Sequence, residues 1–183
     1  MPKTIDEIVR KKNGQKITVV TSYDYTMATL CDQVDILLVG DSAGMVMLGY
    51  ENTSPVTIDQ MCMFTEGVSN GRKNALIVAD LPNKSYENET DAIANSQRLI
   101  KAGADAVKLE GRLPEIIKAI VQDDIPVMGH LGLLPQTATK YTVQGKTESD
   151  VESLLDDAKA LQEAGVFSIV LEMVTSEATK RVT

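Results

Sequence analysis

The sequence has few of the residues that build several common kinds of site. Its two cysteines, Cys31 and Cys62, stand alone without a metal-binding or redox spacing. We therefore expect two buried free thiols and no disulfide. Lysine and arginine form no cluster that could follow a phosphate backbone, and the net charge is −8. This charge balance argues against nucleic acid as a partner.

Long apolar segments are also absent. No apolar run approaches the roughly 18 residues that a membrane span needs, and Met1–Asp6 lacks the apolar stretch of a signal peptide. We therefore expect no membrane partner and a cytoplasmic location. No linker or low-complexity tract divides the 183 residues, so we expect one domain over 1–183, short for an eight-stranded α/β barrel of about 200 to 250 residues.

The sequence does contain a repeated pattern, in which an apolar, β-branched run ends in an acid. Short runs of this kind, separated by helix-length segments, indicate buried parallel strands. Chemistry in such folds lies at the carboxyl ends of the strands, and Mg²⁺ binds a few carboxylates while keeping water positions open for substrate oxygens. A single such acid is more often a solvated or capping residue. The four runs are Leu37–Asp41, Leu76–Asp80, Val107–Glu110 and Ile169–Glu172.

Helix and strand patterns alternate and predict six βα units. Capping boxes start helices at Thr4 and Thr57, and Gly103 and Gly165 end helices. Strand alternation puts Glu110 on the same face as Lys108, so a curled sheet would point Glu110 and Glu172 into one mouth. The predicted strands are 17–22, 37–41, 75–80, 106–110, 126–130 and 168–172. The predicted helices are 57–70, 91–102 and 149–164, together with one that begins at residue 4 and one that begins at residue 114. Loops are predicted after residue 41 and over 131–147.

Eight short motifs follow these strands in order. They are Thr21–Tyr25, Val39–Met45, Ala79–Pro82, Val107–Gly111, Gly129–Leu133, Pro135–Gln136, Val143–Gly145 and Leu171–Glu172. Each is weak alone, but together the chain resembles the ketopantoate hydroxymethyltransferase family over nearly its whole length. The resemblance implies an α/β fold of the (β/α)₈ TIM-barrel type and a homo-oligomer.

The resemblance also implies a reaction in pantothenate biosynthesis. A hydroxymethyl group passes from 5,10-methylenetetrahydrofolate to 3-methyl-2-oxobutanoate, giving 2-dehydropantoate through a Mg²⁺-stabilised enolate. Mapped residue by residue, the resemblance implies that Mg²⁺ or a similar divalent cation binds Asp41, Asp80 and Glu110. It also implies that the substrate binds Ser42, Asp80 and Lys108. Glu172 takes the role of the base.

These residue types suit the reaction. A C–H beside a ketone is too weak an acid for a carboxylate to ionise unless the developing negative charge is stabilised, as a bound cation and Lys108 would do. The base Glu172 should be partly desolvated, so that its pKa rises. His130, the only histidine, is interpreted as a structural residue of the pocket wall. The family usually has Phe and Thr where this chain has Asn83 and Leu134.

The sequence stops at Thr183, where the family continues, so we expect a barrel truncated after the sixth βα unit with unpaired edge strands. Three alternatives are open: a fragment of a transferase, a short form whose edge another chain supplies, or a non-catalytic remnant acting as an interaction protein. Retention of the charged site residues argues against the last. Among enzymes, the alternative is a Mg²⁺-dependent 2-oxo acid enzyme of the phosphoenolpyruvate mutase and isocitrate lyase group.

Overall fold

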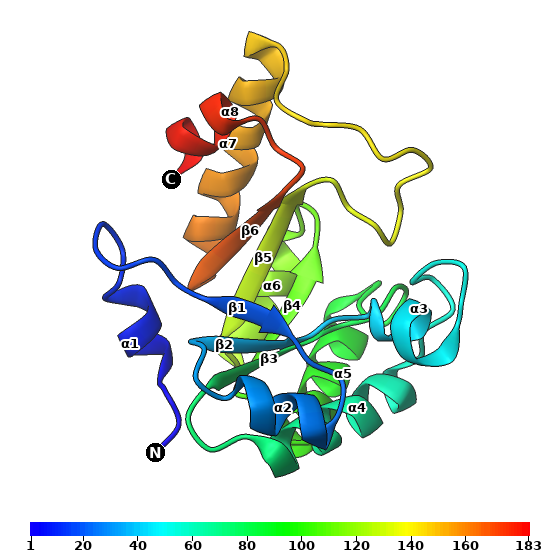
Figure 1. The fold of residues 1–183 in the computed structure, drawn as a ribbon. Helices are drawn as coiled ribbons and strands as arrows, with labels where there is room; N and C mark the ends of the chain where they lie inside the picture. Colours follow the sequence, from blue (N-terminus) through cyan, green and yellow to red (C-terminus); the bar gives the residue numbers. More distant parts are fainter.

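The computed structural model describes residues 1–183 and contains one sheet of six parallel strands (Figure 1). Each strand pairs with the next along the chain, and β1 does not pair with β6, so the sheet is a curled, unclosed half-barrel. All six predicted strands are present, which confirms the α/β fold. They are β1 (Val19–Thr21), β2 (Ile36–Val39), β3 (Leu76–Asp80), β4 (Ala106–Glu110), β5 (Val127–Gly132) and β6 (Ser168–Glu172).

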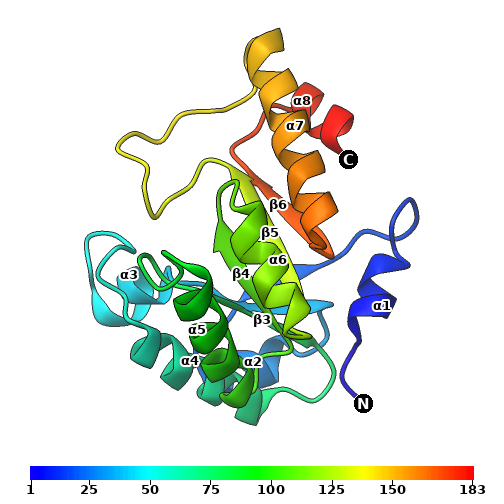
Figure 2. The same ribbon diagram turned by 180° about the vertical axis from the view of Figure 1, so that it is seen from behind.

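The longer helices cover the convex face of this sheet, seen from behind in Figure 2. Neighbouring helices pack side by side in chain order, as expected when every crossover has the same hand. No helix is both long and apolar enough to cross a membrane. The helices are α1 (Ile5–Val9), α2 (Tyr25–Cys31), α3 (Ala43–Leu48), α4 (Ile58–Gly71), α5 (Glu89–Lys101), α6 (Pro114–Gln122), α7 (Glu148–Ala164) and α8 (Ser176–Val182).

Local signals in the sequence fix most helix ends. The capping boxes of Thr4 with Glu7 and of Thr57 with Gln60 are both formed. Gly165 ends α7 at a φ of 101°, a left-handed conformation in which glycine avoids the steric cost of a Cβ. These predicted boundaries are confirmed to within two residues.

Three short helices are absent from the sequence prediction. Helix α3 occupies the segment after β2 where a loop was predicted, because Gly44 and Gly49 give it a low intrinsic helix propensity. Helices α2 and α8 have seven residues each, too few for a clear apolar period. Strand β5 also runs two residues beyond its predicted end, because Leu131 and Gly132 pair with β6.

Apolar side chains fill both faces of the sheet. The larger core cluster lies between the sheet and its helices, and a smaller one fills the concave face. Ile8 of α1 belongs to the smaller cluster, so α1 covers the concave face from the amino ends of the strands. Cys31 and Cys62 are free as expected, but both are half-buried rather than buried.

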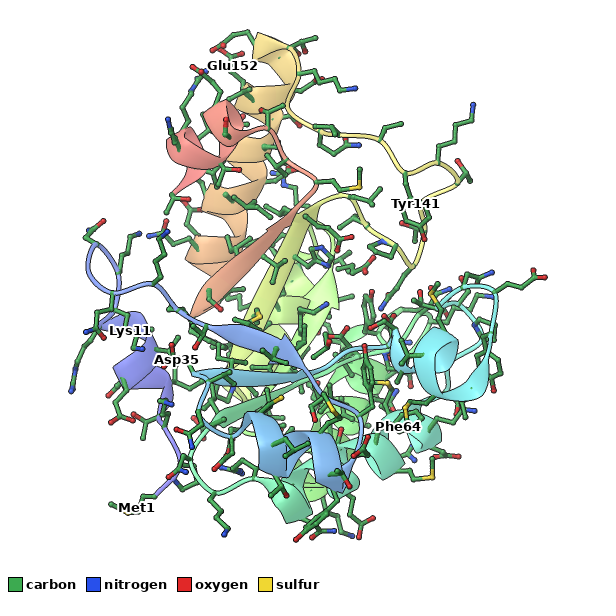
Figure 3. The ribbon with its side chains drawn as sticks, viewed as in Figure 1. Met1, Lys11, Asp35, Phe64, Tyr141 and Glu152 are labelled. Atoms are coloured by element: carbon green, nitrogen blue, oxygen red, sulfur yellow. The ribbon has the colours of Figure 1, made fainter.

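The start of β2 is anchored by a buried acid, Asp35. Its carboxylate accepts a hydrogen bond from Lys11 Nζ at 2.6 Å and from the backbone N–H of Thr18 at 2.9 Å. Lys11 and Asp35 lie on the side of the molecule away from the loop that carries Tyr141 (Figure 3). Burial alone would raise the pKa of Asp35, but these hydrogen bonds outweigh it and lower the pKa to about 2.

Candidate functional site

The carboxyl ends of the strands gather a set of buried polar side chains. The charged residues predicted at the ends of β2, β3 and β4 are all less than a tenth exposed. Helix α3 and the loop over 133–147 lie at this end of the sheet, and the label of Tyr141 marks the loop in Figure 3. The site therefore forms where parallel strands place chemistry. Its buried members with ionisable side chains are Asp41, Asp80, Lys108, Glu110 and His130.

Asp80 and Lys108 form a buried ion pair. They lie directly opposite each other in the register of β3 and β4, and Lys108 Nζ is 3.0 Å from Asp80 Oδ1. The backbone N–H of Asp41 donates to Asp80 Oδ2 at 3.2 Å. A Cβ at Gly40 would lie 2.9 Å from Ser42 Oγ, so glycine permits this close approach of the β2 loop.

The three carboxylates outnumber the single cation beside them. Burial, followed by the charge of Asp80, raises the pKa of Asp41 to about 7. Burial alone would lower the pKa of Lys108, but the charge of Asp80 outweighs it and raises that pKa, so the ammonium stays charged. Asp41 and Asp80 are thus crowded carboxylates with little access to water, and a divalent cation would stabilise their ionised forms.

Gln136, from the loop after β5, joins these strand ends. Its Nε2 donates to Asp41 Oδ2 at 2.8 Å and to the Leu81 carbonyl at 3.0 Å. Its Oε1 accepts from the Tyr86 hydroxyl, and its backbone N–H donates to Glu110 Oε2 at 3.1 Å. The sequence offered only the Pro135–Gln136 motif here, which gave no indication of a role at the site.

Glu110 and Glu172 converge on His130. The Nδ1 atom of His130 lies 3.5 Å from Glu110 Oε1, and Nε2 lies 3.3 Å from Glu172 Oε2. Neither ring nitrogen has hydrogen-bond geometry to a partner. His130 thus lies between the two glutamates, a position that agrees with the structural role predicted for it. The side chain of Glu172 is 39% exposed, so it is accessible at the mouth of the site.

The predicted substrate residue Ser42 also lies at this end of the sheet. Its Oγ is 2.7 Å from the hydroxyl of Tyr23, which belongs to the Thr21–Tyr25 motif. Ser42 precedes α3 but makes no side-chain capping bond to it. Its hydroxyl thus has Tyr23 as its partner and keeps further hydrogen-bonding capacity for a ligand.

The carboxylates fit a metal site with two protein ligands. No three His, Cys, Asp or Glu residues are grouped closely enough to hold a metal ion among themselves. Asp41 and Asp80 adjoin, whereas Glu110 is linked to Asp41 through Gln136, whose backbone N–H donates to Glu110 and whose side-chain amide donates to Asp41. Mg²⁺ usually keeps several waters and binds one or two carboxylates together with substrate oxygens. The donor set therefore suits Mg²⁺ on Asp41 and Asp80, with Glu110 in its surroundings.

A cavity of about 350 Å³ adjoins Glu110 and is lined by the segments that follow β3, β4 and β5. Its floor includes Tyr86 and Gly111, and Arg112 brings a positive charge to it. Asn83 and Leu134, two positions where the chain departs from the family pattern, both line it. These substitutions therefore change the wall of the cavity and leave the buried charged residues in place.

Comparison with known proteins supports this description. The sequence pattern of the family described as ketopantoate hydroxymethyltransferase matches residues 2–183. The 3-methyl-2-oxobutanoate hydroxymethyltransferase of Nitrosopumilus maritimus is 62% identical over 97% of this chain and 67% of the relative, and that of Cenarchaeum symbiosum is 58% identical over 94% and 68%. The chain thus spans about two thirds of the length of these relatives.

Solved structures show the same fold. A 2,3-dimethylmalate lyase of the PEP mutase/isocitrate lyase superfamily superposes with a TM-score of 0.71 at 18% identity, over all of this chain and 66% of that one. A phosphonopyruvate hydrolase in complex with oxalate and Mg²⁺ gives 0.73 at 13%, over 98% and 68%. The much higher identity to the named relatives decides between the two groups, and the chain belongs to the ketopantoate hydroxymethyltransferase family.

Proposed function

We propose that this chain carries the site that transfers a hydroxymethyl group from 5,10-methylenetetrahydrofolate to 3-methyl-2-oxobutanoate, giving 2-dehydropantoate. The observation that carries the proposal is the buried Asp41, Asp80 and Lys108 cluster at the strand ends, with Glu172 accessible across His130. The family to which the chain belongs supports the same reaction. Because the chain covers about two thirds of its relatives, its activity alone is part of the proposal.

Asp41 and Asp80 would hold Mg²⁺ or a similar divalent cation, which supplies positive charge to the keto and carboxylate oxygens of the substrate. The crowding of these two buried carboxylates supports this assignment, and so does a structural neighbour crystallised with oxalate and Mg²⁺. Glu110 would border the cation. Its carboxylate accepts the Gln136 backbone N–H, which holds it in place.

Lys108 would place a second positive charge beside the substrate. Asp80 keeps its ammonium charged, and the burial of the pair excludes water. An ammonium in such a site stabilises the negative charge that develops on the keto oxygen. Ser42 would donate a hydrogen bond to the substrate carboxylate while its neighbour Tyr23 holds it in place.

Glu172 would remove the proton from C3 of the substrate. The electron pair left on C3 would then form the new C–C bond to the one-carbon unit, while the two C–N bonds that hold this unit to the folate break. Water would supply the hydroxyl oxygen, and the two folate nitrogens would take up the protons lost by C3 and by the water. Glu172 suits this role because its carboxylate is half-buried and lies on a strand four positions from β2, across the mouth of the sheet. Its Oε2 lies 3.3 Å from His130 Nε2, so the histidine limits where the carboxylate can move.

Two related proposals concern the context of the chain. A cytoplasmic location is supported by the family's biosynthetic role, and a homo-oligomer is what the family resemblance implies. The alternative of a 2-oxo acid enzyme of the phosphoenolpyruvate mutase group is supported by fold likeness at 13–18% identity. Such likeness shows fold and carries no substrate, because one barrel fold hosts many reactions.

Deuterium exchange at C3 of 3-methyl-2-oxobutanoate tests the proposal, since it requires the cation and the base but no folate. We expect Mg²⁺-dependent exchange that Glu172→Gln reduces at least about 100-fold, in the range of a lost general base. Glu177→Gln, which changes an exposed glutamate on α8, is the matched control and should exchange normally. Unchanged exchange in Glu172→Gln would remove Glu172 from its role.

A further inference from the structure

The amide of Gln136 uses all of its hydrogen-bonding capacity inside the site. Both donors on Nε2 are occupied, by Asp41 Oδ2 and by the Leu81 carbonyl, and Oε1 accepts from Tyr86. Gln136 is 5% exposed. A fully satisfied buried amide is held in one orientation, because any rotation would leave polar atoms unpaired.

Tyr86 determines which end of that amide faces Asp41. Its hydroxyl accepts the Glu110 backbone N–H at 3.4 Å and therefore directs its own proton toward Gln136 Oε1. Burial raises the pKa of Tyr86, so the hydroxyl remains a donor. With Oε1 committed to Tyr86, the NH₂ group of Gln136 must face the carboxylate of Asp41.

An amide NH₂ cannot bind a cation, so its contact with Asp41 has an orienting effect. It occupies Oδ2 of Asp41 at 2.8 Å, and no hydrogen bond in the structure uses Oδ1. The carboxylate is thereby fixed with one oxygen free. Groups that orient a ligand in this way typically change metal affinity by about 10- to 100-fold when they are removed.

We propose that Gln136 is a positioning residue for the cation on Asp41, and that Tyr86 acts through Gln136 by fixing its amide. The inference rests on the cation site of the proposed function. It adds a tyrosine on the β3–α5 connection and a glutamine on the β5–α7 loop to the residues that determine cation affinity.

Mn²⁺ titration of the 183-residue chain, followed by the electron paramagnetic resonance of free Mn²⁺, tests the proposal without any turnover. Gln136→Met keeps the volume but removes both donors, and we expect affinity to fall by about tenfold or more. Tyr86→Phe should weaken it in the same direction by a smaller factor. Gln144→Met is the matched control, because the Gln144 amide bonds only to Thr142 in the same loop, and it should leave affinity within twofold.

The double variant separates positioning from general damage. If Tyr86 acts through Gln136, the double variant binds Mn²⁺ no more weakly than Gln136→Met alone, whereas independent effects would multiply. Multiplying effects would overturn the role given to Tyr86. If Gln136→Met fails to fold, Tyr86→Phe decides, because it removes one hydroxyl only.

Unchanged Mn²⁺ affinity in Gln136→Met would overturn the proposal, even if its melting temperature without metal is lower, since that pattern marks a structural residue. Absence of Mn²⁺ binding in the unaltered chain would overturn it as well. Mn²⁺ binding with the predicted losses, but no C3 exchange, would support the positioning role while refuting the proposed transfer reaction. The two proposals therefore fail separately.

Discussion

Replacing Lys108 with methionine should have opposite effects on stability and on cation binding. The ammonium and its partner Asp80 are both about 5% exposed, with Nζ 3.0 Å from Oδ1. Removing one member of a buried ion pair leaves an uncompensated charge and typically costs about 3–5 kcal/mol. The same change removes the positive charge nearest the cation ligands, so we expect Mg²⁺ to bind more tightly.

Urea unfolding with and without Mg²⁺ measures both effects. Without metal, Lys108→Met should lose about 3–5 kcal/mol of unfolding free energy. Mg²⁺ at about 100 times its Kd should return about 2.7 kcal/mol. Lys118→Met, on the exposed face of α6, is the control and should change stability by less than about 0.5 kcal/mol. C3 exchange should nevertheless fall, because the ammonium no longer stabilises the developing charge.

The double variant Asp80→Asn/Lys108→Met provides a check on this reasoning. Removing both charges relieves the unpaired carboxylate, so the double variant should be more stable than Lys108→Met alone. The reasoning is refuted if Lys108→Met costs less than about 1 kcal/mol, the level of an exposed pair. It is equally refuted if the double variant is less stable than the single one.

Two further predictions concern the remainder of the fold. The pKa of Asp35 falls from 3.8 to about 2 on folding, so its carboxylate stabilises the folded state fully above about pH 4 and loses this contribution as the pH falls toward 2. Asp35→Asn should therefore lower the free energy of unfolding by about 2 kcal/mol at pH 7 and by little near pH 2. A loss that does not depend on pH in urea titrations would contradict this. Strands β1 and β6 each have an unpaired edge in the 183-residue chain. We therefore expect either association of the chain in size exclusion or weak protection of these two strands in hydrogen exchange. A monomer in which both strands are well protected would refute this expectation.

Strands and capped helices were predictable from the sequence because each depends on residues close together in the chain. Strand β3, for example, is buried on both faces and appears as a continuous apolar run that ends in Asp80, with predicted bounds of 75–80 against 76–80 in the structure. The box of Thr57 with Gln60 likewise needs only one turn of chain. Helix α3, with Gly44 inside it, has no comparable local signal.

The candidate site was less predictable, because its geometry depends on distant segments. Strand periodicity indicated that Glu110 and Glu172 could share one mouth, but the position of His130 between them follows from the register of three strands. Gln136 reaches Asp41 from a loop of irregular structure, where no period constrains the chain. A sequence pattern gives the residue types at such a loop without their contacts.

The account depends most on the claim that Asp41 and Asp80 hold a cation opposite the base Glu172. C3 exchange measured with and without Mg²⁺, in the unaltered chain and in Asp41→Asn, tests this claim most directly. We expect exchange in the unaltered chain to require Mg²⁺, and Asp41→Asn to need a Mg²⁺ concentration at least about tenfold higher. Exchange that proceeds without a divalent cation, or an unchanged Mg²⁺ requirement in Asp41→Asn, would contradict the account.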